Sequence, residues 1–299
     1  YELGFEAGIL RDRLTADITY YNKNTINALI ARPLPLSNGE ATARLENIGK
    51  VKNSGLEYQL NARILTDPRA SFELLINGTR NTNKVVDLGA GIKPIIFNDS
   101  HQRNQNGYPL GGYWARPILS FQDLNGDHII SRVNCPGAPT VAGGPACELT
   151  LGDSQVFLGS PFPKTELTFS PRLTLYKNVT VSGLLDHRGG QKLLNFTERF
   201  RCVSFGNCRA ANDKNAPLDD QAAYVAGLQG TDAGYVQDAS FTKLREVSVS
   251  FLVPDRYVTR FGLGGASLTF AGRNLKTWTD YKGIDPEINE NSGFNFSTD

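Results

Sequence analysis

Three oxygen-bearing side chains with alternate spacing are the part of this sequence best suited to metal chemistry. Asp123, Asn125 and Asp127 take positions one, three and five of a calcium-binding loop, the spacing with which an EF-hand loop begins. The match then stops, because His128 stands where such a loop has glycine and Asn134 where it has a bidentate carboxylate. Two interpretations stay open: a structural Ca²⁺ site, or a tight turn around the Asn-Gly-Asp sequence that holds no ion.

The cysteines form two close pairs, Cys135 with Cys147 and Cys202 with Cys208, each in a stretch rich in turn-forming residues. Neither pair has the CxxC spacing or the neighbouring histidine of a zinc site. We therefore predict two loop-closing disulfides formed in an oxidising compartment, with free thiols as the alternative.

Catalytic chemistry finds little support. The only histidines are His101, His128 and His187, and none stands in a metal-ligand spacing. No GxSxG nucleophile motif and no paired-carboxylate arrangement stands out. The acidic pairs Asp219-Asp220 and Asp285-Pro286-Glu287 are interpreted as solvated loop and turn residues. We predict that the protein is not an enzyme and requires no cofactor.

Most of the chain alternates apolar and polar residues with a period of two, which is typical of strands with one apolar face. In residues 163–176 the apolar set is Leu167, Phe169, Leu173 and Leu175, and the polar set is Glu166, Thr168, Ser170, Arg172 and Thr174. The same period recurs in residues 14–20, 56–64, 179–185, 247–253 and 266–272. One face of the predicted sheet therefore favours an apolar environment and the other favours water.

The connections between these stretches alternate between a few residues and a few tens of residues. This asymmetry is typical of an up-and-down, transmembrane antiparallel β-barrel, in which the long loops are extracellular. The expected strands are Glu2–Ile9, Leu14–Ala31, Val51–Leu65, Ser71–Thr82, Gly111–Gln122, Pro163–Tyr176, Val179–Asp186, Ala239–Val253 and Gly265–Leu275. Candidate aromatics for the membrane interface are Tyr20, Tyr21, Tyr58, Phe72, Tyr176, Phe251 and Trp278. The alternative is that these aromatics reflect only the general preference of strands for aromatic residues.

Bulk properties narrow the classes further. The 299 residues carry 31 Lys and Arg against 30 Asp and Glu, a net charge of +1, so no basic field recruits nucleic acid. The mean hydropathy is -0.30, and no run reaches the ~20 apolar residues of a membrane-spanning helix. No shift in composition marks a boundary, and residues 1–299 are expected to form one architecture.

Five strings along the chain go beyond the general strand pattern. They are the NxGxxxNxGxE-like stretch 47–57, the DxNGD-like stretch 123–127, the GxPxP-like stretch 159–163, the YVxDASFxKLR stretch 235–245, and the pair GxNLxTW at 272–278 with YxGxDPE at 281–287. These strings resemble motifs of one family, the SusC/RagA branch of TonB-dependent outer-membrane transporters. Their order and spacing agree with that family across nearly the whole chain.

The resemblance implies an all-β chain that is the C-terminal part of a plugged barrel of about 22 strands, with roughly nine strands in residues 1–299. The plug, the TonB-contacting box and the closing strand are expected outside these residues. In this family the acidic ligand that closes the DxNGD loop follows shortly after it. Here the insert that holds Cys135 and Cys147 is expected to displace that role to Asp153 or Glu148. The lumen-facing residues would include Glu57, Arg63, Arg80, Arg172 and Arg273.

Recognition is expected in the long loops, because binding residues concentrate in loops held by a rigid scaffold. Aromatic faces suited to sugar rings or peptide side chains are Tyr108, Tyr113, Trp114, Phe196, Phe200, Tyr224 and Tyr235. The alternative is that these rings pack the loops against one another.

By resemblance, the leading hypothesis is a SusC-like importer in the outer membrane of a Gram-negative bacterium. It would carry an oligosaccharide or peptide nutrient, draw energy through the TonB complex, and work with a SusD-like surface lipoprotein while its outer wall contacts membrane lipid. A passive outer-membrane channel or adhesin barrel is one alternative. A soluble β-sandwich binding module is another.

Overall fold

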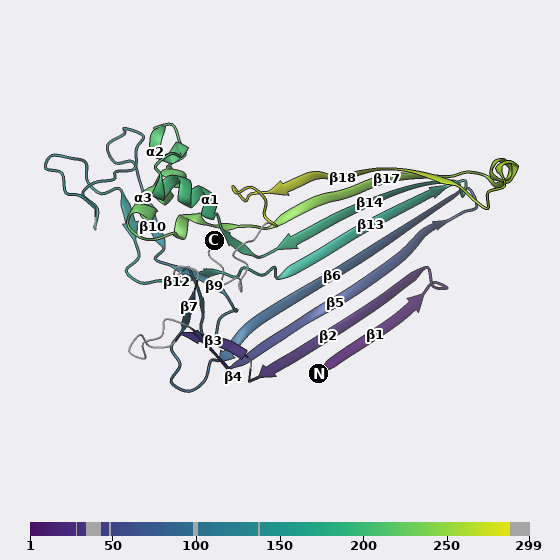
Figure 1. The fold of residues 1–299 in the computed structure, drawn as a ribbon, viewed down its shortest axis with the longest axis horizontal. Helices are drawn as coiled ribbons and strands as arrows, with labels where there is room; N and C mark the ends of the chain where they lie inside the picture. Colours follow the sequence, from purple (N-terminus) through teal and green to yellow (C-terminus); the bar gives the residue numbers. More distant parts are fainter. Residues whose placement is uncertain (28, 34–42, 48, 98–100, 137, 288–299) are drawn as a thin grey trace.

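The computed structural model describes residues 1–27, 29–33, 43–47, 49–97, 101–136 and 138–287. Its main element is an open antiparallel sheet of eight strands in the order β1-β2-β5-β6-β13-β14-β17-β18 (Figure 1). These strands are β1 (Glu2–Ile9), β2 (Leu14–Ile26), β5 (Lys50–Thr66), β6 (Ala70–Asp87), β13 (Thr165–Leu175), β14 (Val179–Gly189), β17 (Phe241–Leu252) and β18 (Ser267–Thr279). Each strand pairs with its neighbours in this order, which is the connectivity of an up-and-down wall.

Two strand predictions need correction. Gly111–Gln122 does not join the large sheet but divides into β9 (Gly112–Ala115) and β10 (Ile118–Phe121), which belong to two small sheets. Pro117 lies between them and has no N–H to continue a ladder. The predicted strand Leu14–Ala31 ends earlier, at Ile26, because Asn27 takes a positive φ of 56°.

The strand register shows which side chains share a face. Phe169 lies opposite Ile76 of β6 and Leu185 of β14. Leu173 lies opposite Phe72 of β6 and Val181 of β14. Directly opposed residues in an antiparallel sheet point to the same side. These rows make up one surface of the sheet, called the apolar face below.

The opposite surface, called the polar face, is built by the alternate residues. One row runs across five strands through Thr19, Glu57, Thr79, Glu166 and Arg188. The predicted division between the two residue sets in 163–176 is therefore present in the register.

Arg80 is an exception to the predicted lumen-facing set. It lies opposite Leu56 and Thr165, and it is exposed on the same face as Leu74 and Ile76. Tyr21, a candidate aromatic for the membrane interface, lies on the polar face. Its ring covers the backbone of its register partner Gly55 there. Neither residue lies in a stretch for which alternation was predicted, and the strand register decides which face each one takes.

The two ends of the sheet differ strongly (Figure 1). At one end the connections are short: β13 turns into β14 through Tyr176, Lys177 and Asn178, the first two at positive φ. At the other end the chain makes long excursions that fold together. The longest short-end connection holds only α4 (Asp255–Val258) and the 3-10 helix η4 (Thr259–Phe261).

The long excursions form a separate layer, called the loop cap below. Its strands are β3 (Leu29–Pro33), β4 (Ala43–Asn47), β7 (Ile95–Phe97), β8 (Gln102–Asn104), β9, β10, β11 (Leu149–Leu151), β12 (Val156–Gly159), β15 (Lys192–Leu194) and β16 (Val236–Asp238). Its helical segments are α1 (Phe196–Arg199), the π-helix η2 (Phe200–Ser204), α2 (Arg209–Asn212), α3 (Leu218–Leu228) and η3 (Ala233–Tyr235). Among the described residues, no helix has both the length and the apolar character that a membrane crossing needs.

Helix α3 is the centre of the loop cap, and residues Gln221 to Gly227 are buried. One side of the helix packs through Ala223 and Tyr224 against the disulfide of α2 and η2, and the other packs through Val225 against Ile130 and Leu149. The cap therefore has a compact apolar core of the kind found in soluble domains.

Candidate functional site

Charged side chains form a continuous ladder on the polar face, at the end nearest the loop cap. Arg188 Nε of β14 lies 3.5 Å from Glu166 Oε2 and 3.9 Å from Asp186 Oδ2. Arg245 of β17 donates to the same Asp186 oxygen from Nε at 3.1 Å. Three neighbouring strands are thus connected by alternating charges.

The ladder continues into the segment after β18. Lys243, a buried residue of β17, donates from Nζ to Asp285 Oδ1 at 2.8 Å and to Glu287 Oε2 at 2.6 Å. Arg245 also donates to Glu287, from Nη1 to Oε2 at 2.8 Å. We refer to Glu166, Asp186, Arg188, Lys243, Arg245, Asp285 and Glu287 as the ionic network. Asp285 and Glu287 are therefore not the solvated turn acids that the sequence suggested.

Electrostatics within the ionic network are strong. Glu287 lies beyond the last strand of the sheet, and the hydrogen bond from Arg245 lowers the pKa of its carboxyl to about 2, with Lys243 adding to the effect. Glu287 is therefore ionised at every physiological pH. The network ties two family-like strings together, since Lys243 and Arg245 belong to one and Asp285 and Glu287 to the other.

Sequence reasoning overlooked this network, although a signal existed. Two cations two residues apart, Lys243 and Arg245, are matched by two carboxylates two residues apart, Asp285 and Glu287. The register shift against β14 between Leu244 and Glu246 shows a bulge in β17 at Arg245. Neither the bulge nor the partner segment could be located without the fold.

Further from the cap, the polar face holds a shallow hollow of about 430 Å³. Its carboxylates are Asp17, Glu57 and Glu166, and the amides and hydroxyls around them are Thr19, Gln59, Asn77, Thr79 and Thr168. These groups accept or donate hydrogen bonds but include no nucleophile paired with a base. The hollow is suited to recognition of polar solutes rather than to bond cleavage.

In the Asp123–Asp127 loop, the predicted metal ligands are engaged by backbone N–H groups. Asp123 Oδ1 accepts from Gly126 at 2.7 Å, and Asp123 Oδ2 accepts from His128 at 2.9 Å. Asp127 Oδ1 accepts from Ile129 at 2.8 Å, and Asn125 Nδ2 donates to Asp127 Oδ2 at 2.9 Å. These bonds account for the tight turn without an ion, and calcium at this loop stays a prediction.

Glu148 accepts hydrogen bonds from backbone N–H groups within this loop and just after it. It is buried, its Oε1 accepts from Leu124 N at 2.8 Å, and its Oε2 accepts from Ser131 N at 2.9 Å. Asp153, the other residue expected here, is exposed, and it does not come together with Asp123 and Asp127 as a group of three carboxylates. Among the described residues, the one cluster with metal-ligand geometry is Glu198 with Cys202 and Cys208, whose sulfurs are joined to each other.

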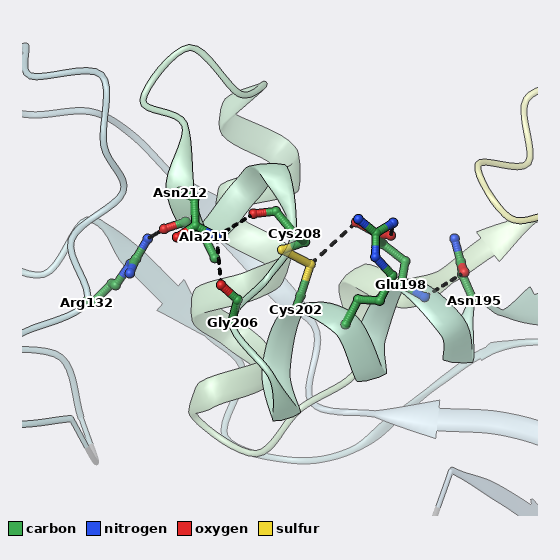
Figure 2. Close-up of a disulfide and its surroundings, with 9 residues drawn as sticks. Arg132, Asn195, Glu198, Cys202, Gly206, Cys208, Ala211 and Asn212 are labelled. Carbon is green, nitrogen blue, oxygen red and sulfur yellow. Dashed lines mark hydrogen bonds and ion pairs between the residues drawn. A yellow bond between two sulfur atoms is a disulfide. The ribbon is translucent and has the colours of Figure 1, made fainter.

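Both cysteine pairs are disulfides in the loop cap. Cys135–Cys147 spans 12 residues and Cys202–Cys208 spans 6. Figure 2 shows how the second bridge closes the turn between η2 and α2, beside Glu198, whose N–H is capped by the Asn195 side chain at 3.2 Å. Arg132, which lies in the stretch before the first bridge, reaches the carbonyl oxygen of Ala211 at 2.5 Å (Figure 2).

The predicted recognition aromatics divide into two groups. Tyr113, Trp114, Tyr224 and Tyr235 are buried in the loop cap, so they pack the loops against one another. Tyr108 belongs with them, since its ring lies 4.7 Å from the Trp114 ring, centroid to centroid. Burial raises the pKa of the Tyr113 and Tyr235 hydroxyls, which are outside the wall strands.

Phe196 and Phe200 remain accessible, with 39% and 44% of their surface exposed. Their rings stack with centroids 5.8 Å apart, and Phe205 meets Phe200 edge-on at 5.0 Å. Of the predicted ring set, these two residues therefore present faces at the surface of the loop cap.

Two further ionic clusters lie in the cap and beside it. Buried Asp232 accepts from Arg199 Nε at 3.0 Å and pairs with His101, which is distant in sequence. Burial alone would raise the pKa of Asp232, but the hydrogen bonds from His101 and Arg199 outweigh it and lower this pKa. Lys282 lies 2.5 Å from Asp220 and 3.2 Å from Asp219. Asp219 and Asp220 lie in the first turn of α3 rather than in a loop, and they form these ion pairs while their side chains stay exposed to solvent.

The fold and this distribution of groups define a class: an open segment of an antiparallel up-and-down barrel wall, with one apolar face, one polar face and a structured loop cap at one end. Residues 1–128 match the family model described as "TonB dependent receptor-like, beta-barrel".

Similar proteins agree with this class. TonB-dependent receptor P3 of Formosa agariphila is 28% identical over 314 residues, covering 96% of this chain and 30% of the relative. TonB-dependent receptor SusC of Bacteroides thetaiotaomicron is 21% identical, covering 96% of this chain and 29% of SusC. The structure of the RagAB peptide transporter matches with a TM-score of 0.71 and 22% identity over 95% of this chain and 32% of that one.

The resemblance to SusC/RagA-type TonB-dependent transporters, predicted from the sequence strings, is confirmed, as is the partial barrel fold. The chain spans about 30% of the length of the curated relatives it matches.

Proposed function

We propose that this chain forms part of the barrel wall of a TonB-dependent importer that carries an oligosaccharide or peptide nutrient across the outer membrane of a Gram-negative bacterium. The observation that carries the proposal is the two-faced sheet. Large apolar side chains such as Phe5, Phe270 and Leu268 are exposed on one face, while acids, amides and hydroxyls cover the other. A wall with lipid on one side and an aqueous passage on the other requires this division.

In this function the chain makes and breaks no bond in the substrate. The apolar face contacts membrane lipid, the polar face lines the passage or contacts a plug, and the cap meets the substrate and a SusD-like surface lipoprotein. Energy enters through the TonB complex, which acts on other parts of the protein. Nucleic acid has no role, in keeping with the net charge of +1.

The polar-face hollow supports a polar, hydrogen-bonding substrate. The carboxylates of Asp17, Glu57 and Glu166 accept hydrogen bonds from hydroxyl or ammonium groups, and the nearby amides supply donors as well. The structural neighbours are described as a peptide importer and transporter, which favours peptides as one of the two substrate classes for this chain.

An uptake experiment with the full-length protein separates an importer from a passive channel. Cells that express it would be given labelled oligosaccharide and peptide mixtures, with and without an uncoupler of the proton-motive force, and in a strain lacking TonB. Uptake that stops in both conditions supports the importer. Uptake that continues unchanged would favour the passive channel and overturn the proposal.

Extraction separates a membrane wall from a soluble sandwich. We expect the full-length protein to stay in the membrane fraction until detergent is added and to migrate heat-modifiably in gels, because unfolding a barrel changes its mobility. Release into the aqueous fraction without detergent would contradict the membrane assignment.

A further inference from the structure

The apolar face ends, on the side of the loop cap, at a group of cations on β5 and β6. Lys52, Arg80 and Lys84 form what we call the cationic patch. Val51 and Val85, the neighbours of the two lysines, are buried, so strand alternation turns Lys52 and Lys84 to the opposite side. Arg80 shares the apolar face with its register partner Leu56.

The patch has no acidic partner within the described part of the chain: none of the ion pairs there involves its three residues. Lys52 and Lys84 are direct register partners. Like charges opposed across two strands destabilise a sheet. The one row of this face between these lysines and Arg80 holds Ser54 and Thr82, which supply hydroxyls but no negative charge.

The position of the patch along the strands indicates that it lies near the level of the lipid headgroups. The row of Arg80 contains Leu3, Tyr20 and Leu56 on the neighbouring strands, all exposed. The Tyr20 ring lies 6.2 Å from the Tyr1 ring, centroid to centroid. Tyrosines at the edge of an apolar belt mark the level of lipid headgroups. The two lysines share one row, which lies two rows of the same face further toward the cap.

We infer that the cationic patch binds the anionic headgroup of a lipid in the membrane leaflet on the loop-cap side. A headgroup phosphate would lie between Lys52 and Lys84, and Arg80 would lie on the side of the phosphate away from the cap. This inference rests on the proposed membrane function. A lipid is the occupant that the geometry favours, because the patch adjoins the apolar belt and an acyl chain of the same molecule would lie along it. A phosphate anion also relieves the repulsion between the opposed lysines.

The test uses the full-length protein in detergent, titrated with phosphatidylglycerol or phosphatidylcholine and observed by native mass spectrometry. The variant Lys52→Gln/Lys84→Gln is compared with Lys23→Gln/Lys214→Gln, which removes the same charge. Lys23 lies at a similar height but on the polar face, and Lys214 lies in the cap. Since each cation near an anionic surface contributes roughly a fivefold factor in affinity, we expect phosphatidylglycerol to bind the patch variant roughly tenfold or more weakly.

We expect the control variant to bind like the wild type, and Lys52→Arg/Lys84→Arg to restore binding. Equal losses in both glutamine variants, no preference over phosphatidylcholine, or inorganic phosphate binding as tightly as the lipid would each overturn the inference. Failure here is distinct from failure of the proposed function, because a protein that shows TonB-dependent uptake yet has no lipid preference refutes only the patch.

Discussion

The barrel wall and the loop cap use apolar residues in opposite ways. In the wall, Phe5 and Phe270 leave 63% and 61% of their surface exposed, whereas in the cap Tyr113 leaves 1% exposed. A wall that meets lipid has no need to hide its apolar side chains from its surroundings, but loops in water must bury theirs. The two regions are built for two solvents.

They also differ in what holds them together. The wall depends on backbone ladders between long neighbouring strands, while the cap has two disulfides, a buried helix and the buried Asp232 contacts. The ionic network lies where the two regions meet, on β13, β14, β17 and the segment after β18. Changes to each region should therefore leave different signatures, and three predictions exploit this, beginning with the largest effect.

The largest effect is expected for a charge on the apolar face of the wall. Phe169→Arg, in the middle of β13, should destabilise the folded full-length protein in lipid by about 2–4 kcal/mol, because the charge loses its hydration there. Thr168→Arg, one residue away on the polar face, should cost less than about 1 kcal/mol. Urea titrations in vesicles, followed by heat-modifiable migration, measure both. Equal losses would refute the assignment of the two faces.

A smaller effect, confined to the cap, is expected when the disulfides are removed. Chain-entropy estimates give about 3 kcal/mol for Cys135→Ala/Cys147→Ala, whose loop spans 12 residues, and about 2 kcal/mol for Cys202→Ala/Cys208→Ala, whose loop spans 6. Hydrogen exchange should rise in the cap and stay unchanged in β13 and β14. A rise in those strands would show that wall and cap unfold as one unit.

The smallest effect concerns the junction between wall and cap at low pH. The carboxyl of Glu287 has a folded pKa of about 2, lowered from 4.5 mainly by Arg245, so it stabilises the folded state above pH 4.5. That stability is lost as the pH falls from 4.5 toward 2. After allowance for partial exposure, we expect roughly 1–2 kcal/mol, measured as hydrogen exchange in residues 281–287.

Glu287→Gln is the matched variant for the pH prediction. It keeps the size of the side chain but removes the titrating group, so its exchange should be faster at neutral pH and should vary much less between pH 4.5 and 2. If the wild type and the variant showed the same pH profile, the stabilisation would have to come from another group in the ionic network.

The sequence was most informative about the wall, because each strand alternates apolar and polar residues according to the two environments that its faces meet. The strand Glu2–Ile9 has the predicted bounds, whereas β2 ends at Ile26 instead of Ala31 and β6 continues to Asp87 instead of ending at Thr82. It was least informative where register and distant partners decide the outcome. Arg80 was expected to face the lumen but lies on the apolar face of the sheet. The burial of Tyr113 depends on helix α3, which carries Ala223 and Tyr224 and lies far along the chain.

By itself, the sequence determined the all-β wall, the asymmetry of its two ends, the cysteine pairs and the likeness to a transporter family, because these follow from local periodicity, spacing and short strings. Only the tertiary structure decided that Lys243 and Arg245 meet Asp285 and Glu287, that the Glu148 carboxylate accepts from the backbone of the acidic loop at Leu124, and that three cations gather at the edge of the apolar belt. Such contacts join residues that the chain separates by tens of positions, and only the packing of neighbouring strands and loops brings them within reach.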